Sequence, residues 1–219
     1  MDKSVDVVIT YQYVSGGMKA EPVSVKGRPR EFDLEQALAA ALQVFWRQGY
    51  EGASLTDLTE AMGITRPSLY AAFGNKEALF RKALDLYERD KLCFTKTALE
   101  APTARGVVER MLRGALSMQT SACDPHGCLG VISTLACGGE AESVKAHVIE
   151  RRKSSEVALC ERFEQAQNSG DLPANVDPRD MAQYLYALMQ GMAVQAGAGA
   201  DAAQLAKLVD TALALWPSA

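Results

Sequence analysis

Three cysteines and a histidine lie close together in the middle of the chain, and side chains of these types can do chemistry. Cys123 and Cys128 flank His126, and Cys137 follows. Thiolates and an imidazole can hold a soft metal ion. The overall spacing is not that of a zinc finger or zinc ribbon, however, so it is weak evidence for a metal site. We therefore expect no metal ion and no cofactor here.

A reactive thiol is the second interpretation of this cluster. Cys128 stands near the start of an apolar segment predicted to be helical, where the helix dipole favours the thiolate, and His126 is close enough in sequence to assist. A cysteine on an apolar helix can equally be a small core residue. Both interpretations stay open for Cys128 and Cys123, whereas Cys93 and Cys160 are expected to be structural.

A second group of polar residues is suited to contact with DNA. Thr65, Arg66, Pro67, Ser68 and Tyr70 begin a short predicted helix. Arg66 can read a guanine with two hydrogen bonds or hold a phosphate, and Tyr70 can give its hydroxyl to a phosphate. The two alanines that follow, Ala71 and Ala72, leave base reading to residues 65–70.

The segment from Ser54 to Phe73 must position these residues, and it reads as two helices around a tight turn. Ser54 is a suitable N-cap for the first helix, with Asp57 favourably placed in its first turn. Gly63 can adopt the left-handed conformation that ends this helix. Thr65 can cap the second helix, whose first turn tolerates Pro67. This pattern predicts a helix-turn-helix, whose second helix enters the major groove.

A helix is also predicted on each side of this segment, from Asp33 to Gly49 and from Asn75 to about Cys93. Ahead of the first of them lies the basic segment Lys26–Arg30. Inserted arginines such as Arg28 and Arg30 suit the negative potential of a minor groove. The alternative is a solvated linker that carries these charges by chance.

The order and spacing of residues around this segment resemble the DNA-binding domain of the tetracycline-repressor (TetR) family over about residues 30 to 82. The residues that carry the resemblance are Gly49-Tyr50, Ser54-Leu55, Leu58, Gly63-Ile64-Thr65, Leu69-Tyr70, Phe73 and Asn75 to Phe80. The resemblance implies a phosphate contact by Lys76 and an effector pocket in a variable second domain. It also implies that the last two helices, at about 178–216, pair with those of a second copy. Ala71 and Ala72 depart from the bulkier residues often found there in the family, which leaves the operator sequence open.

The remainder of the chain predicts further amphipathic helices. They are expected from about Ala104 to Thr120, from Cys128 to Cys137, from Glu140 to Gln167, and in two final segments that begin at Asp177 and Asp201. The final two carry apolar stripes that a monomer of this size cannot bury completely, which favours a homodimer. The alternative is that both stripes are internal core.

Composition limits the function classes. The chain has 219 residues, a net charge of -4, and five cysteines at irregular spacing. DNA binding must therefore rest on a local basic surface, and the odd cysteine count argues against a secreted disulfide scaffold and for the cytoplasm. No signal peptide or membrane-spanning run is evident. Residues 1–17 are interpreted as a start-site artefact or a disordered tail, and the strand-like Val5–Tyr11 has no evident partner.

The sequence thus predicts an all-α protein with a three-helix helix-turn-helix domain and a helical ligand-binding and dimerisation domain. The expected parts are a flexible tail over 1–29 with its basic arm at 26–30, a DNA-binding domain over 30–76, and a second domain over 77–219. We expect a transcriptional regulator, usually a repressor, that is released by a small-molecule or thiol-reactive effector. An enzyme built on Cys128 and His126 is the alternative. Residues expected to line the effector pocket, beside Cys128 and Cys123, are Met111, Met118, Leu135, Tyr184 and Met189.

Overall fold

The computed structural model describes residues 8–12, 19–23, 32–135 and 141–217, of which 8–12, 19–23 and Leu135 are described by their backbone alone. The chain divides into two units, Met1–Asp33 and Leu34–Ala219. Within the first unit, strands β1 (Val8–Gln12) and β2 (Lys19–Val23) form an antiparallel hairpin in which Val8 lies opposite Val23. The sequence predicts no partner for the first strand. This prediction is wrong, since β2 pairs with it. The partner was missed because β2 contains a proline and three polar or small residues, which is not the usual composition of a strand.

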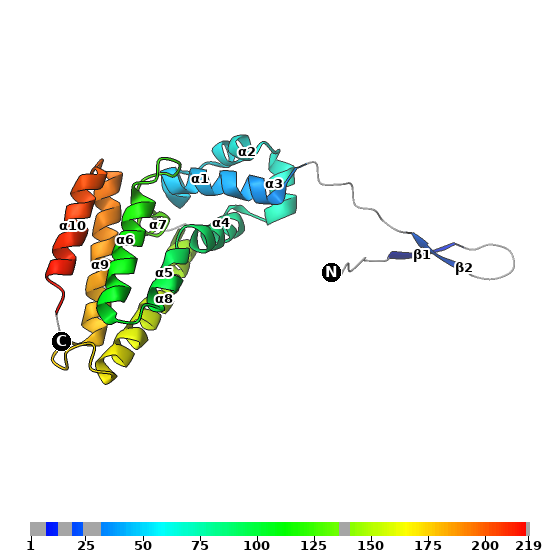
Figure 1. Ribbon diagram of the computed structural model, residues 1–219. Coiled ribbons are helices and arrows are strands. Elements are labelled where there is room, and N and C mark those ends of the chain that lie inside the picture. The colour runs from blue at the N-terminus through cyan, green and yellow to red at the C-terminus, as the bar shows by residue number, and fades with distance from the viewer. Residues whose placement is uncertain (1–7, 13–18, 24–31, 136–140, 218–219) are drawn as a thin grey trace. The chain divides into compact units, whose positions relative to one another are not determined.

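The second unit is built from helices among its described residues, as the sequence predicts. Helix α1 (Leu34–Gly52) runs three residues beyond the expected end and is interrupted at Gly49, where φ is 71°. It is followed by α2 (Leu55–Met62), α3 (Arg66–Phe73) and α4 (Lys76–Asp90). Figure 1 shows α1, α2 and α3 together at one end of this unit, with α4 leading toward the remaining helices.

The helix-turn-helix forms for the reasons that the sequence offers. Ser54 caps α2, and Gly63 ends it in the left-handed conformation with φ 64° and ψ 30°. Thr65 then caps α3, which has a proline in its first turn. Leu58 and Leu69 are fully buried where the two helices face the core. The two helices are therefore held by capping at their ends and by apolar packing on one face.

An aromatic cluster joins α1 to α4. The rings of Phe45 and Phe80 meet edge to face with centroids 5.2 Å apart, and Tyr50 contacts both. Trp46 is completely buried and meets Tyr87 of α4 edge to face at 4.8 Å. Trp46 is therefore a packing residue, and its ring partner lies at the far end of α4 rather than within the helix-turn-helix.

The remaining helices make a second core. They are α5 (Cys93–Leu99), α6 (Ala104–Gln119), α7 (Leu129–Leu135), α8 (Glu142–Asn168), α9 (Pro178–Gly197) and α10 (Ala202–Ala214). The sequence does not predict α5. The helix that is expected to continue to Cys93 ends at Asp90, and a new helix begins at Cys93. Figure 1 shows α6, α9 and α10 side by side, and their buried apolar residues form one cluster with those of α8. Among the described residues, no helix is both long and apolar enough to cross a membrane.

Candidate DNA-binding surface and effector cavity

The first candidate site is the outer face of α3 and the ends of its neighbouring helices. Leu69 and Phe73 anchor α3 in the core, while Arg66, Pro67 and Tyr70 are exposed. The Thr65 hydroxyl accepts a hydrogen bond from the backbone N–H of Ser68 at 3.3 Å and is also hydrogen-bonded to the Ser68 hydroxyl at 3.0 Å. The structure thus brings the predicted residues of α3 together at one end of the helix.

Arg66 does not extend freely into solvent. Its Nη2 donates to the hydroxyl of Thr56 on α2 at 2.8 Å. This contact fixes the direction of the guanidinium before DNA is bound, which lowers the conformational entropy lost when an Arg side chain binds. Thr56 could not be predicted as the partner of Arg66, because a spacing of ten residues across a turn forms no recognisable pattern.

Two further residues flank α3. The Ser54 hydroxyl accepts from the Asp57 N–H at 3.0 Å, while the Asp57 carboxylate accepts from the Ser54 N–H at 3.1 Å. The Ser54 hydroxyl also donates to the Asp57 carboxylate at 2.7 Å. This bond first, and the bond from the Ser54 N–H second, lower the pKa of Asp57. On the other side, the ammonium of Lys76 lies 4.6 Å from the ring centre of Tyr50. Burial lowers the pKa of Lys76, and the nearby Glu51 carboxylate acts in the opposite direction. Arg28 and Arg30 lie outside the described residues.

The second candidate site is a cavity of about 210 Å³ among α4, α5, α6, α7, α8 and α9. Three of the expected residues line it, namely Met118, Cys128 and Met189. Tyr87, Gln119, Tyr186 and Gln190 also line it and were not expected. Burial raises the pKa of the Tyr186 phenol to about 12.

Other residues expected in the lining lie elsewhere. Tyr184 is 49% exposed, because a step of two residues from Tyr186 turns by about 200° around the helix and places it on the opposite face of α9. Met111 lies on the same face of α6 as Met118 but two turns away, within the buried core. Cys123 is exposed in the loop before α7. The side chain of Leu135 is outside the described residues.

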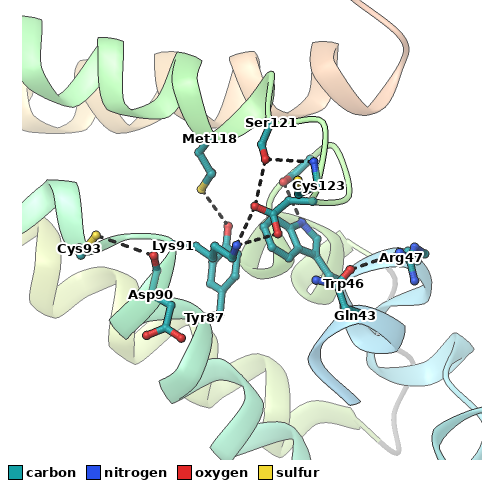
Figure 2. A network of polar contacts seen from close by, with 12 residues as sticks. Gln43, Trp46, Arg47, Tyr87, Asp90, Lys91, Cys93, Met118, Ser121 and Cys123 are labelled. Carbon is teal, nitrogen blue, oxygen red and sulfur yellow. Dashed lines mark hydrogen bonds and ion pairs between the residues drawn. The ribbon is translucent and has the colours of Figure 1, made fainter. Parts of the chain in front are cut away.

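Tyr87 of α4 makes polar contacts at the wall of this cavity, and Figure 2 shows the one with Met118. The hydroxyl of Tyr87 is the donor for two sulfur atoms, Cys128 Sγ at 3.5 Å and Met118 Sδ at 3.7 Å. Burial raises the pKa of Tyr87 well above its usual value, and the Cys128 sulfur adds to this shift. The phenol therefore keeps its proton at neutral pH and can serve as a donor toward the cysteine. No group of three or more potential metal ligands lies together among the described residues.

The loop before α7 is held by three separate contacts. Lys91 of α4 forms an ion pair with Asp124 at 2.7 Å. Gln119 at the end of α6 accepts from the Gly127 N–H at 2.8 Å, and the indole Nε1 of Trp46 donates to the Gly127 carbonyl at 3.0 Å. His126 is exposed in this loop. Sequence reasoning missed Trp46, Gln119 and Gly127, because their contacts join residues far apart in the chain.

Comparisons with known proteins cover most of the chain. Residues 37–83 match the family model described as bacterial regulatory proteins, tetR family, and residues 107–212 match a tetracyclin repressor-like C-terminal domain. The HTH-type transcriptional repressor ComR of Escherichia coli K12 is 34% identical over 199 residues, which is 88% of this chain and 92% of ComR.

Two solved structures are similar at comparable identity. A cysteine mutant of the TetR family transcriptional regulator CifR, complexed with 26-bp double-strand operator DNA, is 41% identical with a TM-score of 0.83; the match covers 87% of this chain and all of that chain. A putative TetR transcriptional regulator from Rhodococcus sp. RHA1 is 39% identical with a TM-score of 0.57, over 85% of this chain and all of that chain.

Proposed function

This chain belongs to the tetR family of bacterial regulatory proteins, and we propose that it is a repressor that leaves its operator when an effector enters the cavity. Its family makes it a DNA-binding transcriptional regulator. We assign DNA binding to the outer face of α3, because Leu69 is buried on its inner face while Arg66 and Tyr70 are exposed. The whole chain carries a net charge of -4, so a few placed cations must supply the attraction to DNA.

The proposed DNA contacts follow from the position of each side chain. Arg66 reads a base edge or a phosphate from the first turn of α3, and Tyr70 reaches a phosphate one turn later. Ser54, Thr65 and Ser68 combine capping with contact to the DNA backbone. Lys76, at the start of α4, holds a phosphate on the other side of α3, while Pro67 shapes its first turn. Arg28 and Arg30 are proposed as the minor-groove arm.

The protein acts as a homodimer, and we propose that α9 and α10 form the interface. Exposed apolar side chains remain on α9, where Tyr184 is 49% and Val194 52% exposed, and directly after α10, where Leu215 is 73% exposed. Tyr184, Ala187, Gly191 and Val194 follow one another at three- and four-residue steps and thus share one face of α9. Large apolar residues exposed along one helix face are typical of a surface that a second helix covers.

We propose that the effector occupies the cavity beside Cys128. A small molecule can bind there reversibly, or an electrophile can react with the thiol, which has the Tyr87 phenol as its hydrogen-bond donor. Either effector would favour a conformation in which the two recognition helices no longer fit successive major grooves. The size of that shift is limited by the difference in effector affinity between the two conformations.

A catalytic role for Cys128 and His126 receives no support from this arrangement. His126 is exposed, and the hydrogen-bond partner of the Cys128 sulfur among the described residues is Tyr87 rather than an imidazole. A Cys-His nucleophile requires the base within hydrogen-bond reach of the thiol.

A gel-shift assay on the DNA that flanks the protein's own gene tests the proposed function. We expect a retarded band at about 0.15 M salt that unlabelled copies of the same DNA remove and unrelated DNA does not. Arg66→Ala is compared in the same assay. It changes one exposed side chain that is proposed to contact DNA, and it should weaken the retarded band. A band that unrelated DNA removes equally well contradicts sequence-specific binding.

A further inference from the structure

Gln119 is a buried polar residue at the wall of the cavity, with only 3% of its surface exposed. Its Oε1 accepts from the Gly127 N–H at 2.8 Å. Across the described part of the chain, no protein group accepts a hydrogen bond from its amide Nε2. A carboxamide carries two donor hydrogens there, and Gln119 lines the cavity, where a ligand can accept from them. The Gln119 oxygen is therefore hydrogen-bonded within the protein, whereas its amide nitrogen can bind a ligand in the cavity.

The wall near Gln119 is mostly apolar. Ala115, Met118 and Val131 contribute apolar surface there. At the edge of the cavity, Arg151 forms ion pairs with Glu88 and Asp85, and Arg152 pairs with Glu156. Lys96 also lines the cavity, and its ammonium forms no ion pair with the described residues. The wall around Gln119 itself therefore favours a ligand that is mostly apolar.

We propose that the effector is a small, mostly apolar molecule with a carbonyl oxygen, and that Gln119 Nε2 binds this oxygen. The Gly127 N–H uses one lone pair of Gln119 Oε1, whereas both hydrogens on Nε2 have no acceptor among the described residues. The group that matches these donors is a hydrogen-bond acceptor such as a carbonyl oxygen. This inference rests on the proposed function, because it names the class of effector for the same cavity.

Gln119 also links the ligand to the DNA-binding half of the protein. The same carboxamide holds Gly127, whose carbonyl accepts from the indole of Trp46 in α1. A carbonyl that reorients the Gln119 amide changes the Gly127 peptide and thereby the environment of Trp46. Binding through Gln119 and a change at Trp46 are thus two readouts of one event.

Two probes of similar shape test the ligand class. Acetophenone has the carbonyl, and α-methylstyrene replaces its oxygen by a methylene group. The protein holds two tryptophans, so a Trp216→Phe variant leaves Trp46 as the sole tryptophan fluorophore. We expect acetophenone to bind about five-fold or more tightly than α-methylstyrene, and to shift the Trp46 emission. Equal binding of these two, or no binding of either at saturation, would overturn the inference.

Variants of two carboxamide side chains in the cavity test whether Gln119 causes the preference for acetophenone. Gln119→Met removes the donor and should abolish the preference for acetophenone, and Gln119→Glu should do the same while keeping an acceptor for Gly127. Gln190→Met is the matched control, because Gln190 lines the cavity without a contact to Gly127, and it should keep the preference. A preference that survives both Gln119 variants overturns the inference. Operator binding by the protein without probe is measured separately, so a failure here leaves the regulator assignment standing.

Discussion

The indole N–H of Trp46 donates a 3.0 Å hydrogen bond to the carbonyl oxygen of Gly127. Trp46 belongs to α1, which packs against α2 of the helix-turn-helix, whereas Gly127 directly precedes Cys128 at the cavity wall. The bond is buried and joins residues 81 positions apart. It is therefore a direct contact between the proposed effector site and the part of the protein that carries the proposed DNA-binding surface. A movement of either part would change this hydrogen bond.

Removal of this bond should destabilise the protein and weaken its response to an effector. Trp46→Phe keeps an aromatic ring against Tyr87 but leaves the Gly127 carbonyl without its donor. We expect the free energy of unfolding in urea to fall by about 1–3 kcal/mol from the unsatisfied carbonyl, with a further loss from the smaller ring. Trp216→Phe is the control, since Trp216 packs against Phe163 and loses packing alone. An equal response to effector in wild-type and Trp46→Phe protein would contradict the coupling.

Arg66 and Lys76 should contribute to DNA binding in different ways. Arg66→Ala is expected to weaken operator binding by about 1–3 kcal/mol and to relax sequence preference at one position, because its guanidinium lies at the base-reading end of α3. Lys76→Ala should weaken binding to all sequences and reduce the slope of log K against log salt by about one. The measurement is a salt titration of binding to operator and unrelated DNA. Identical effects of both changes on specificity would refute these roles.

Thr56 provides a finer test of the Arg66 role. Thr56→Val removes the hydroxyl that holds the guanidinium at 2.8 Å, and Thr56→Ser keeps it. We expect only the valine variant to lose affinity, by a few-fold, and to lose nothing further in the Arg66→Ala background. A loss that adds fully to that of Arg66→Ala would mean that Thr56 acts on its own.

Cys128 should decide whether the protein responds to electrophiles. N-Ethylmaleimide should release wild-type protein from operator DNA, and Cys128→Ser should abolish this release. Cys123→Ser is the control, because Cys123 is exposed in the loop and does not line the cavity. If the Cys128→Ser variant responds as the wild type does, reaction at this thiol is not the signal.

The capping box of α2 gives a prediction for stability and its pH dependence. Ser54→Ala should cost about 1 kcal/mol, the usual loss for an N-cap. The pKa of Asp57 is lowered from its ordinary 3.8, chiefly by the Ser54 side chain. A carboxyl with a lowered pKa stabilises the fold at pH values above the ordinary pKa, and this contribution is lost as pH falls through the folded pKa. The stability difference between wild type and Asp57→Asn should therefore be full at pH 6 and shrink below about pH 4. A constant difference over this range would exclude a role for the ionised carboxylate.

The local features of this fold could be predicted from sequence, because the signals for them are local. Ser54, Gly63 and Thr65 mark the ends of α2 and α3 through caps that span three residues or fewer. The family resemblance rests on the same short spacings, and the comparisons confirm it. Apolar periodicity likewise located α6, α8, α9 and α10 to within a few residues.

The cavity and its connection to α1 could not be predicted in the same way. Periodicity shows that Tyr184 and Tyr186 both lie on α9, but only the packing of α9 against its neighbours shows which one faces the cavity. The Trp46–Gly127 bond depends on how two distant segments approach, and no pattern within either segment specifies it. Gln119 has no sequence signal at all, since a polar residue at the end of a helix is usually exposed.

Selection from random double-stranded DNA is the most direct test of the central claim, that two copies of α3 read two half-sites. After several rounds of binding at about 0.15 M salt, the account predicts an enriched inverted repeat. Its half-sites should be centred one helical turn, about 34–36 Å, or a multiple of that distance apart. No enriched sequence, or an enriched sequence without two-fold symmetry, would contradict the account.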